Sequence, residues 1–589
     1  MDSPRSSWKN AGVSKKSEKR RSPEAPKRAR NTLRGGDPIS LPPIRTTAFR
    51  QFSVSLLIAA AAVICYWNTR EYEFVRWDDT GYVIGNPLVT GDGGLKSIWL
   101  DVFRDKPVKL YYPLVWTSYW IEYQFFRDSP AGYHIVQMVL HALASVAVFL
   151  AIVSLGAPLL AAATAGLLFA VHPINVASVA WIAERKNTLS AIFFWGSLLA
   201  YVQFRRSGGI WRYIAAILAF QFSLFAKTAC VVLAPILLVT DRLLDGKWTA
   251  RAIARTAPFF GLALTMGLLT ASAESQNRKS GEPLEWLLRP FVAAASLVHY
   301  IVKTIVPLDL VPVYQRWPAS LSEPRYWITS AGVAVACGLV WKFRRRLAPL
   351  AWWSIAVFLL ALGPALGLIQ FNFLQFSFVS DHFVYFGLPG LLLIAGLLLE
   401  YAAGTTASPG TDSSHPTWLQ SPGIRRRAAW MMLFTIAAIL GWLTIRQNRI
   451  WKDPESFWTY TLDHNPDCVA GAFNLGNHYY QKNDYEAAMP RYAQAAKIDP
   501  EMIIYQRACA RCSRQLGRVD EAITYYARTI ENHTKKNSRG INDRIEFANY
   551  LLALNRVADA QREFEAVLRI QPNNQAAAQG LDQARSRQR

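Results

Sequence analysis

The sequence is poor in charged residues and in cysteine. Only 18% of its 589 residues are Asp, Glu, Lys or Arg, whereas about 25% is usual for soluble proteins. Its six cysteines show no spacing typical of a disulfide framework, and no phosphate-cradling glycine loop follows a strand pattern. These absences argue against a disulfide-stapled module and a soluble nucleotide-sugar site, and the 52% apolar content favours contact with lipid.

Acidic residues are also scarce relative to basic ones, with 41 Asp and Glu against 64 Lys and Arg. Such a surplus on one soluble face would indicate nucleic-acid binding. Here, however, residues 1–50 carry 13 Lys and Arg against 4 Asp and Glu, and short loops between apolar runs hold much of the rest. We therefore expect a disordered basic tail over 1–50, topology-setting loops, and no nucleic-acid partner.

Apolar runs recur between residues 52 and 445, each long enough or nearly long enough to cross about 30 Å of hydrocarbon. No small-residue cleavage site follows the first run, which predicts an uncleaved span rather than a signal peptide. We expect eleven spans, near 52–67, 133–154, 157–172, 188–204, 211–226, 228–244, 253–273, 326–342, 350–370, 384–400 and 428–445.

The positive-inside rule keeps the basic N-terminus in the cytoplasm. The later basic loops also fall inside if the segment 286–306, which contains Arg289 and Lys303, is re-entrant or interfacial. If it crosses, those loops switch to the outside. An odd number of spans places the C-terminal region outside the cytoplasm, so the pattern predicts a membrane domain over 51–446 with an outer loop at 68–131.

A repeat of 34 residues begins after Lys452. Repeats are expected near 469–502, 503–536 and 541–574 of a domain spanning 453–589. In the first unit, the positions of the tetratricopeptide signature are occupied by Leu475, Gly476, Tyr479, Ala488, Tyr492, Ala495 and Pro500. Stacked helix pairs of this type form a concave surface for extended peptides or proteins. Cys509 and Cys512 fall within the second unit, where packing is favoured over redox chemistry.

Two adjacent carboxylates, Asp78 and Asp79, lie among aromatic residues in the outer loop 68–131. A carboxylate in such a place can act as a general base that takes a proton from an acceptor hydroxyl. The alternative is a solvated acid pair without a catalytic role. The pair can also be read as a cation ligand, so metal dependence stays open.

Several motifs give the chain a resemblance to a known family. The most specific are Leu168-Phe169-Ala170-Val171-His172-Pro173 and the run from Val179 to Lys186; the others are Phe74-Val75-x-x-Asp78-Asp79, Asn86-Pro87, Tyr112-Pro113-Leu114, Gly132-Tyr133-His134, Leu140-His141, Ala226-Lys227, Val306-Pro307 with Tyr314, and Asp381-His382-x-x-Tyr385. Over nearly all of 52–589 the sequence resembles the transmembrane and tetratricopeptide-repeat O-mannosyltransferases and their bacterial relatives.

The resemblance implies an all-α protein: a polytopic GT-C-like membrane helix bundle followed by a tetratricopeptide-repeat solenoid. It implies a glycosyltransferase of the cytoplasmic (inner) membrane that takes a sugar, mannose in the family, from a polyprenyl-phosphate carrier. The acceptor would be a protein hydroxyl on the non-cytoplasmic face, and the repeats, periplasmic or extracytoplasmic, would recruit it. The lipid-linked sugar is then a substrate, and no cofactor is expected.

The same resemblance implies roles for single residues. Asp78 or Asp79 is the base, with Asp78 slightly favoured. The leaving phosphate needs cations or hydrogen-bond donors, for which the candidates are His172, Arg185, Lys186, Lys227 and His382. Supporting roles are expected for His134, His141, Glu184, Asp381 and Tyr385.

Five of these residues have an alternative role. Arg185 and Lys186 can anchor lipid headgroups, Lys227 can be a structural partner of Glu184, and His134 and His141 can make interhelical hydrogen bonds.

The sequence also departs from the family pattern, since Ala177 stands where relatives usually have Glu and His382 where they have Arg. These departures motivate a rival hypothesis, a non-catalytic membrane scaffold that binds partners through its repeats.

Overall fold

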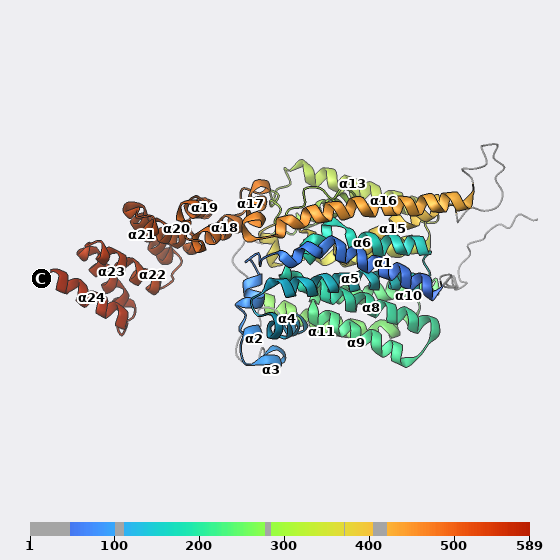
Figure 1. The fold of residues 1–589 in the computed structure, drawn as a ribbon, viewed down its shortest axis with the longest axis horizontal. Helices are drawn as coiled ribbons and strands as arrows, with labels where there is room; N and C mark the ends of the chain where they lie inside the picture. The colour runs from blue at the N-terminus through green and yellow to red at the C-terminus, as the bar shows by residue number, and fades with distance from the viewer. Residues whose placement is uncertain (1–46, 101–110, 277–283, 370, 405–420, 589) are drawn as a thin grey trace, which may run out of the picture.

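The computed structural model describes residues 47–100, 111–276, 284–369, 371–404 and 421–588. All regular elements in these ranges are helices, and together they form a bundle of roughly parallel and antiparallel helices with a helical arm at one end (Figure 1). The all-α prediction is therefore confirmed for this part of the chain. The tail predicted over 1–50 lies almost wholly outside the described residues.

The bundle is built from long apolar helices, many of which begin at a proline whose fixed φ suits the first helical turn. They are α1 (Ala48–Tyr66), α5 (Pro130–Ser154), α6 (Leu159–Val171), α8 (Arg185–Ser207), α9 (Ile210–Ala226), α10 (Leu233–Asp245), α11 (Ala250–Gln276), α12 (Arg289–Ile305), α13 (Pro324–Phe343), α14 (Pro349–Leu362), α15 (Leu388–Ala402) and α16 (Pro422–Asn448). At the centre, α15 approaches α6 so closely that a Cβ at Gly396 would collide with the backbone of Ala161. Small residues of this kind let membrane helices pack tightly.

Five helices in the described ranges are long and apolar enough to cross a membrane: Ala48–Glu71, Pro130–Ser154, Ala250–Ser272, Pro324–Phe343 and Gly423–Trp451. A sixth results if α6 and the helical stretch Pro173–Val179, bent by 50°, count as one span. Three more apolar helices are shorter. The expected number of eleven is thus not confirmed, because several predicted runs fold as short helices interrupted by 3-10 turns, such as η6 (Thr228–Val232).

The arm consists of successive helix pairs, and equivalent helices of neighbouring pairs follow the predicted 34-residue period. For example, α18 and α20 begin 34 residues apart. Its helices are α17 (Pro454–His464), α18 (Val469–Gln481), α19 (Tyr485–Ile498), α20 (Ile503–Gln515), α21 (Val519–Lys535), α22 (Ile541–Ala553), α23 (Val557–Ile570) and α24 (Gln575–Gln588). Gly476 has no side chain where α18 meets the Tyr492 ring of α19. Cys509 and Cys512 are both buried and unpaired there, as packing positions would be.

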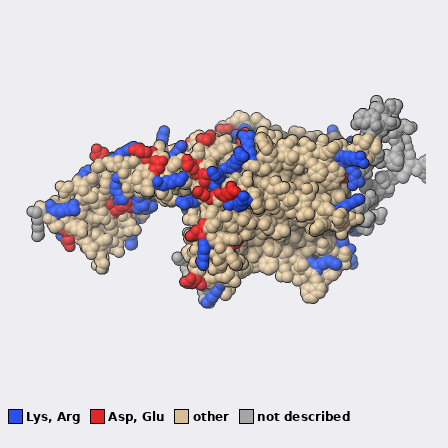
Figure 2. All heavy atoms as spheres, in the orientation of Figure 1, with Lys and Arg blue, Asp and Glu red and all other residues tan. Residues whose placement is uncertain are grey.

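The segment between α1 and α5 lies at the same end of the bundle as the arm (Figure 1). It contains a short π-helical turn η2 (Thr80–Ile84), then α2 (Pro87–Thr90), α3 (Gly94–Trp99) and α4 (Pro113–Phe126). Asn86 caps α2 by accepting a hydrogen bond from the Leu88 N–H at 3.0 Å. This end also carries both acidic and basic side chains, whereas Lys and Arg gather without visible Asp or Glu at the opposite end (Figure 2).

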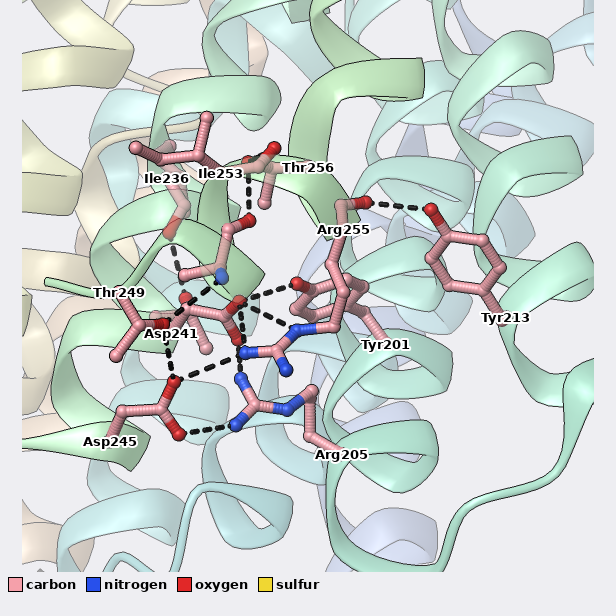
Figure 3. Close-up of polar contacts among 12 residues, drawn as sticks. Tyr201, Arg205, Tyr213, Ile236, Asp241, Asp245, Thr249, Ile253, Arg255 and Thr256 are labelled. Atoms are coloured by element: carbon pink, nitrogen blue, oxygen red, sulfur yellow. Dashed lines mark hydrogen bonds and ion pairs between the residues drawn. The ribbon is translucent and has the colours of Figure 1, made fainter. Parts of the chain in front are cut away.

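An ion-pair network ties three helices together at that opposite end (Figure 3). Asp241 of α10 pairs with Arg205 of α8 and, at 3.0 Å, with Arg255 of α11. Asp245, one turn further along α10, pairs with Arg205 at 2.6 Å and with Arg255 at 3.1 Å. The Tyr201 hydroxyl donates a further hydrogen bond to Asp241 at 2.9 Å. The network fixes the far ends of helices whose other ends reach the site described below.

We expect Asp241→Ala to lower the free energy of unfolding by about 3–5 kcal/mol, because breaking a buried ion pair leaves its partner uncompensated. The matched control is Asp245→Ala, which removes a carboxylate whose side chain is 24% exposed, whereas that of Asp241 is fully buried. The free energy of unfolding should fall distinctly less in Asp245→Ala than in Asp241→Ala. Denaturant unfolding of the full chain in detergent measures both, and equal losses would contradict the buried role of Asp241.

Candidate functional site

A cavity of about 570 Å³ lies between the segment after α1, the start of α8 and the segment between α14 and α15. Its lining divides by chemistry. The polar residues are Asp78, Tyr82, Tyr112, Glu184, Lys186, Lys227, Thr228, Thr270 and His382. The remainder is aromatic or aliphatic: Trp77, Trp181, Ala229, Ala361, Pro364, Ala365, Ile369, Phe371, Phe373, Phe376, Phe383 and Phe386. Five of the residues predicted from sequence therefore meet in one cavity.

The loop that bears the acid pair turns the two carboxylates in different directions. Asp78 is half-buried and lines the cavity. Asp79 is fully buried and accepts hydrogen bonds from the backbone N–H groups of Val75 and Ala183, both at 2.9 Å. These two bonds fasten the loop to the turn η5 (Ile182–Glu184) that precedes the basic residues. Asp78 thus faces the cavity, while Asp79 holds the loop in place.

Both carboxylates are less acidic than usual. Burial raises the pKa of Asp79 to about 7, although the two backbone N–H groups act against this. Burial also raises the pKa of Asp78, and the Lys186 ammonium opposes that rise. A carboxylate with a raised pKa is a better proton acceptor near neutral pH. The geometry leaves this chemistry to Asp78, because the oxygens of Asp79 are already bonded.

Two lysines and one glutamate form the charged side of the cavity. The Lys186 ammonium lies 2.8 Å from a Glu184 carboxylate oxygen and 5.3 Å from the centre of the Tyr82 ring. Lys227, directly after α9, donates a hydrogen bond to the Asn187 side-chain oxygen. Burial works against ionisation of Glu184, but the ammonium groups of Lys186 and Lys227 outweigh it and lower the pKa of this carboxylate. Burial lowers the pKa of Lys227.

Arg185 does not reach the cavity. Its guanidinium pairs with both oxygens of Glu122 in α4, and it also donates to the Gln137 side chain at 2.5 Å and to the Tyr133 carbonyl at 2.9 Å. Arg185 is fully buried. Consecutive residues of a helix point about 100° apart, so at the start of α8 only Lys186 faces the cavity. The predicted phosphate contact of Arg185 therefore has no geometric basis in this structure.

Three histidines with predicted roles, His134, His141 and His172, make contacts within the helix bundle and do not reach the cavity. His172 donates from Nε2 to the Thr304 carbonyl at 3.0 Å, and His141 Nδ1 lies 2.8 Å from the Tyr385 hydroxyl. His134 is buried, with its ring edge-on to that of Tyr72. None of these three histidines, nor Tyr385, lines the cavity. His141, whose Nε2 also lies 3.1 Å from the Ala170 carbonyl of α6, fits the interhelical alternative.

The turn η9 (Asp381–Phe383) brings His382, but not Asp381, to the cavity. Asp381 is buried and accepts a hydrogen bond from the Tyr314 hydroxyl at 2.8 Å; burial raises its pKa to about 7. His382 Nδ1 lies 2.8 Å from the Ser380 hydroxyl, and Nε2 lies 3.8 Å from Glu184. Burial lowers the pKa of His382 to about 3, so the ring is neutral at pH 7.

Sequence reasoning missed Glu122 and the aromatic lining. Glu122 is an isolated acid in the aromatic helix α4, and that isolation inside an apolar stretch could have marked it as the partner of a buried cation. The stack of Trp77 on Trp181, with ring centres 4.9 Å apart, joins residues 104 positions apart and has no signal in a single sequence. Ala177 is buried in α7 (Val176–Val179) and does not line the cavity.

Among the described residues, the cavity combines the Asp78 carboxylate, which has no ion-pair partner there, with two ammonium groups and a large apolar wall. In the described ranges, no three His, Cys, Asp or Glu side chains gather closely enough to hold a metal ion. The arrangement can bind an amphipathic anion and accept a proton beside it.

We expect His382 to remain uncharged from pH 8 down to pH 5. The ring takes up a proton near pH 6.5 in the unfolded chain but only near pH 3 when buried. Its contribution to stability is therefore complete above pH 6.5 and declines as the pH falls toward 3. NMR of the full chain with labelled histidine measures this, with His382→Gln to assign the signal. A midpoint between pH 6 and 7 would contradict the burial.

Comparison with known proteins supports the resemblance seen in the sequence. A tetratricopeptide-repeat family model matches residues 457–503 and 473–536. The human protein O-mannosyl-transferase TMTC3 is 33% identical over 170 residues, which cover 27% of this chain and 18% of that protein. A protein O-mannosyl-transferase of Caenorhabditis elegans is 20% identical over 477 residues, covering 76% of this chain and 62% of that protein.

Among solved structures, the oligosaccharyltransferase AglB from Archaeoglobus fulgidus is similar over 73% of this chain and 59% of its own, with 13% identity and a TM-score of 0.34. The matches to the human and nematode proteins thus span less than two thirds of those relatives. The chain is a relative of proteins named O-mannosyl-transferases, and it carries tetratricopeptide repeats.

Proposed function

We propose that this chain is a membrane glycosyltransferase that transfers a sugar from a polyprenyl-phosphate carrier to a protein hydroxyl. The observation that carries the proposal is the cavity in which a carboxylate, two ammonium groups and a continuous apolar wall meet. The names of the relatives support transfer of mannose. A soluble nucleotide-sugar donor would have no use for the apolar wall.

The donor is proposed to lie along the cavity with its phosphate near Lys186 and Lys227. Ammonium groups stabilise the charge that develops on a phosphate as it leaves. The first isoprene units would contact the apolar residues between α14 and α15, such as Phe371 and Phe376. Glu184, which already balances part of the positive charge, would offset the repulsion between the two ammonium groups.

Asp78 is proposed to act as the general base. It would take the proton of the acceptor hydroxyl as that oxygen bonds to the sugar C1, while the bond from C1 to the phosphate oxygen breaks. The phosphate leaves as the anion bound by the lysines. Asp79 and Arg185 contribute through position: one fixes the loop, and the other fixes α4 against α8.

We further propose that the cavity and the repeats lie on the non-cytoplasmic side of the cytoplasmic membrane. The end of the bundle opposite the repeats gathers Lys and Arg (Figure 2), as cytoplasmic loops do. This placement supports a GT-C arrangement in which shorter apolar helices such as α9 and α15 also cross the bilayer. The repeats would then present the protein acceptor on the same side as Asp78.

A second candidate function is a scaffold that retains the fold but transfers no sugar. It is favoured by the neutral ring of His382 and by Ala177, where the family resemblance leads one to expect charged residues. Purified protein that neither binds nor consumes a lipid-linked sugar, but captures partners through residues 453–589, would support the scaffold.

The test of the transferase compares Asp78→Asn with Asp79→Asn. We expect Asp78→Asn to lower transfer from polyprenyl-phosphate mannose to a Ser/Thr peptide by about 10²–10⁴-fold, because a general base is lost. Asp79→Asn should lower transfer by loosening the loop, which hydrogen exchange over residues 73–84 would report, whereas Asp78→Asn should leave that exchange unchanged. Asp92→Asn, an exposed acid of the same loop, is the control. Full activity in both site variants would exclude the proposed base.

A further inference from the structure

The root of the repeat arm, residues 451–481, packs against both segments that bear the polar groups of the cavity. One is the loop 73–78, which ends at Asp78, and the other is the segment 311–315, which bonds to the turn of His382. The arm is therefore more than a module attached by its chain connection. Its first helices form part of the scaffold around the site.

The first contact is a cluster of indole rings. Trp77 stacks on Trp181 with the ring planes only 10° apart, and the edge of Trp458 from α17 meets Trp77 at 5.4 Å between ring centres. Phe457 lies 6.3 Å from Trp77, and Trp451 lies 5.8 Å from Trp181. Trp458 is fully buried. Trp77, the residue directly before Asp78, is thus held between the bundle and the arm.

The backbone before Trp77 is also held from the arm. The Glu73 N–H donates to the Lys452 carbonyl at 2.8 Å, and the Arg76 guanidinium donates to the Gln481 side chain of α18. Arg76 has a φ of 53°, in the left-handed region that is unfavourable for a residue other than glycine. A turn of this kind persists only where surrounding contacts determine it, and the arm supplies contacts on both sides of it, beside those that Asp79 and Trp181 make.

The second contact runs to the other side of the cavity. Asn465, in the link between α17 and α18, donates to the Val313 carbonyl at 3.2 Å, and Gln315 donates to Asp467 at 3.2 Å. Between these two bonds, the Tyr314 hydroxyl donates to Asp381 at 2.8 Å. Asp381 is the direct neighbour of His382. The arm therefore stabilises this side of the cavity through the segment 313–315, which bonds both to the arm and to Asp381.

We propose that the root of the repeat arm is a positioning element of the active site, in which Trp458 holds Trp77 and thereby sets the place of Asp78. The inference rests on the proposed function. It differs from the view that the repeats only recruit the acceptor, because it predicts a role in turnover of acceptors too short to reach the distal repeats.

The expected loss of rate in a Trp458 variant follows from how strictly catalysis depends on the position of the reacting groups. A displacement of about 1 Å in a reacting group can cost about 10²-fold in rate. Removing the indole of Trp458 frees one face of Trp77, and the left-handed turn at Arg76 can then relax. The loss should appear in kcat, because Trp458 contacts Trp77 directly before Asp78, whereas the two lysines and most of the apolar wall, in the stretch 361–386, belong to other segments.

The experiment compares Trp458→Ala, Trp458→Leu and Trp458→Phe in the full chain, with a tripeptide acceptor and polyprenyl-phosphate mannose. We expect Trp458→Ala to lower kcat about 10- to 100-fold with the KM for the donor within about twofold, and Trp458→Phe to restore most of the loss. The matched control is Phe547→Ala in α22, which removes a ring stacked on Tyr526 far along the arm. It should leave kcat for the tripeptide unchanged.

Hydrogen exchange over residues 73–80 provides a readout that does not depend on activity. It should rise in Trp458→Ala and stay unchanged in Phe547→Ala. Unchanged kcat and unchanged exchange in Trp458→Ala would overturn the proposal; if that variant does not fold, Trp458→Leu decides by the same criteria. If the unmodified chain transfers no sugar, the proposed function fails, and exchange alone then decides whether Trp458 positions the loop.

Discussion

The site depends on one buried carboxylate that joins two segments far apart in the sequence. Asp79 bonds the amide of Val75 in its own loop and the amide of Ala183 in the turn before α8. These bonds, together with the stack of Trp77 on Trp181, fix the acid-bearing loop against the lysine-bearing helix. A carboxylate that accepts two N–H groups in a buried place costs much to remove, because both donors would then lack a partner. The distance between Asp78 and the two lysines of the cavity thus depends on a residue that does not line the cavity.

The sequence alone predicted the general organisation well but not the number of spans. The 34-residue period identified the repeat helices because each repeat buries the same small residues, such as Gly476 and Ala510, against its neighbours. Span counting was less successful because an apolar run in a tightly packed bundle need not be one long helix. Near Lys227 the chain turns through η6 instead of continuing straight, and hydrophobicity does not distinguish the two outcomes.

The structure brings several of the predicted site residues into one cavity and turns others away from it. Lys186, Lys227, Glu184, His382 and Asp78 were all expected near the reaction and all line the cavity. Arg185 and Asp79 carry the same charges as their neighbours yet point elsewhere, because their orientation depends on partners in distant segments, Glu122 for Arg185 and the Ala183 amide for Asp79. A pattern of residue types holds no information about such partners when a single sequence is read.

The two sides of the cavity come from differently organised parts of the chain. The polar groups are contributed by several separate segments, from Asp78 to His382, whereas most of the apolar wall comes from the single stretch 361–386. Substitutions within that stretch can therefore reshape the apolar side of the cavity and leave the lysines where they are. Under the proposed function, carrier length and sugar chemistry become separable traits, so that a related chain can adapt to a different polyprenol without rebuilding the groups proposed to transfer the sugar.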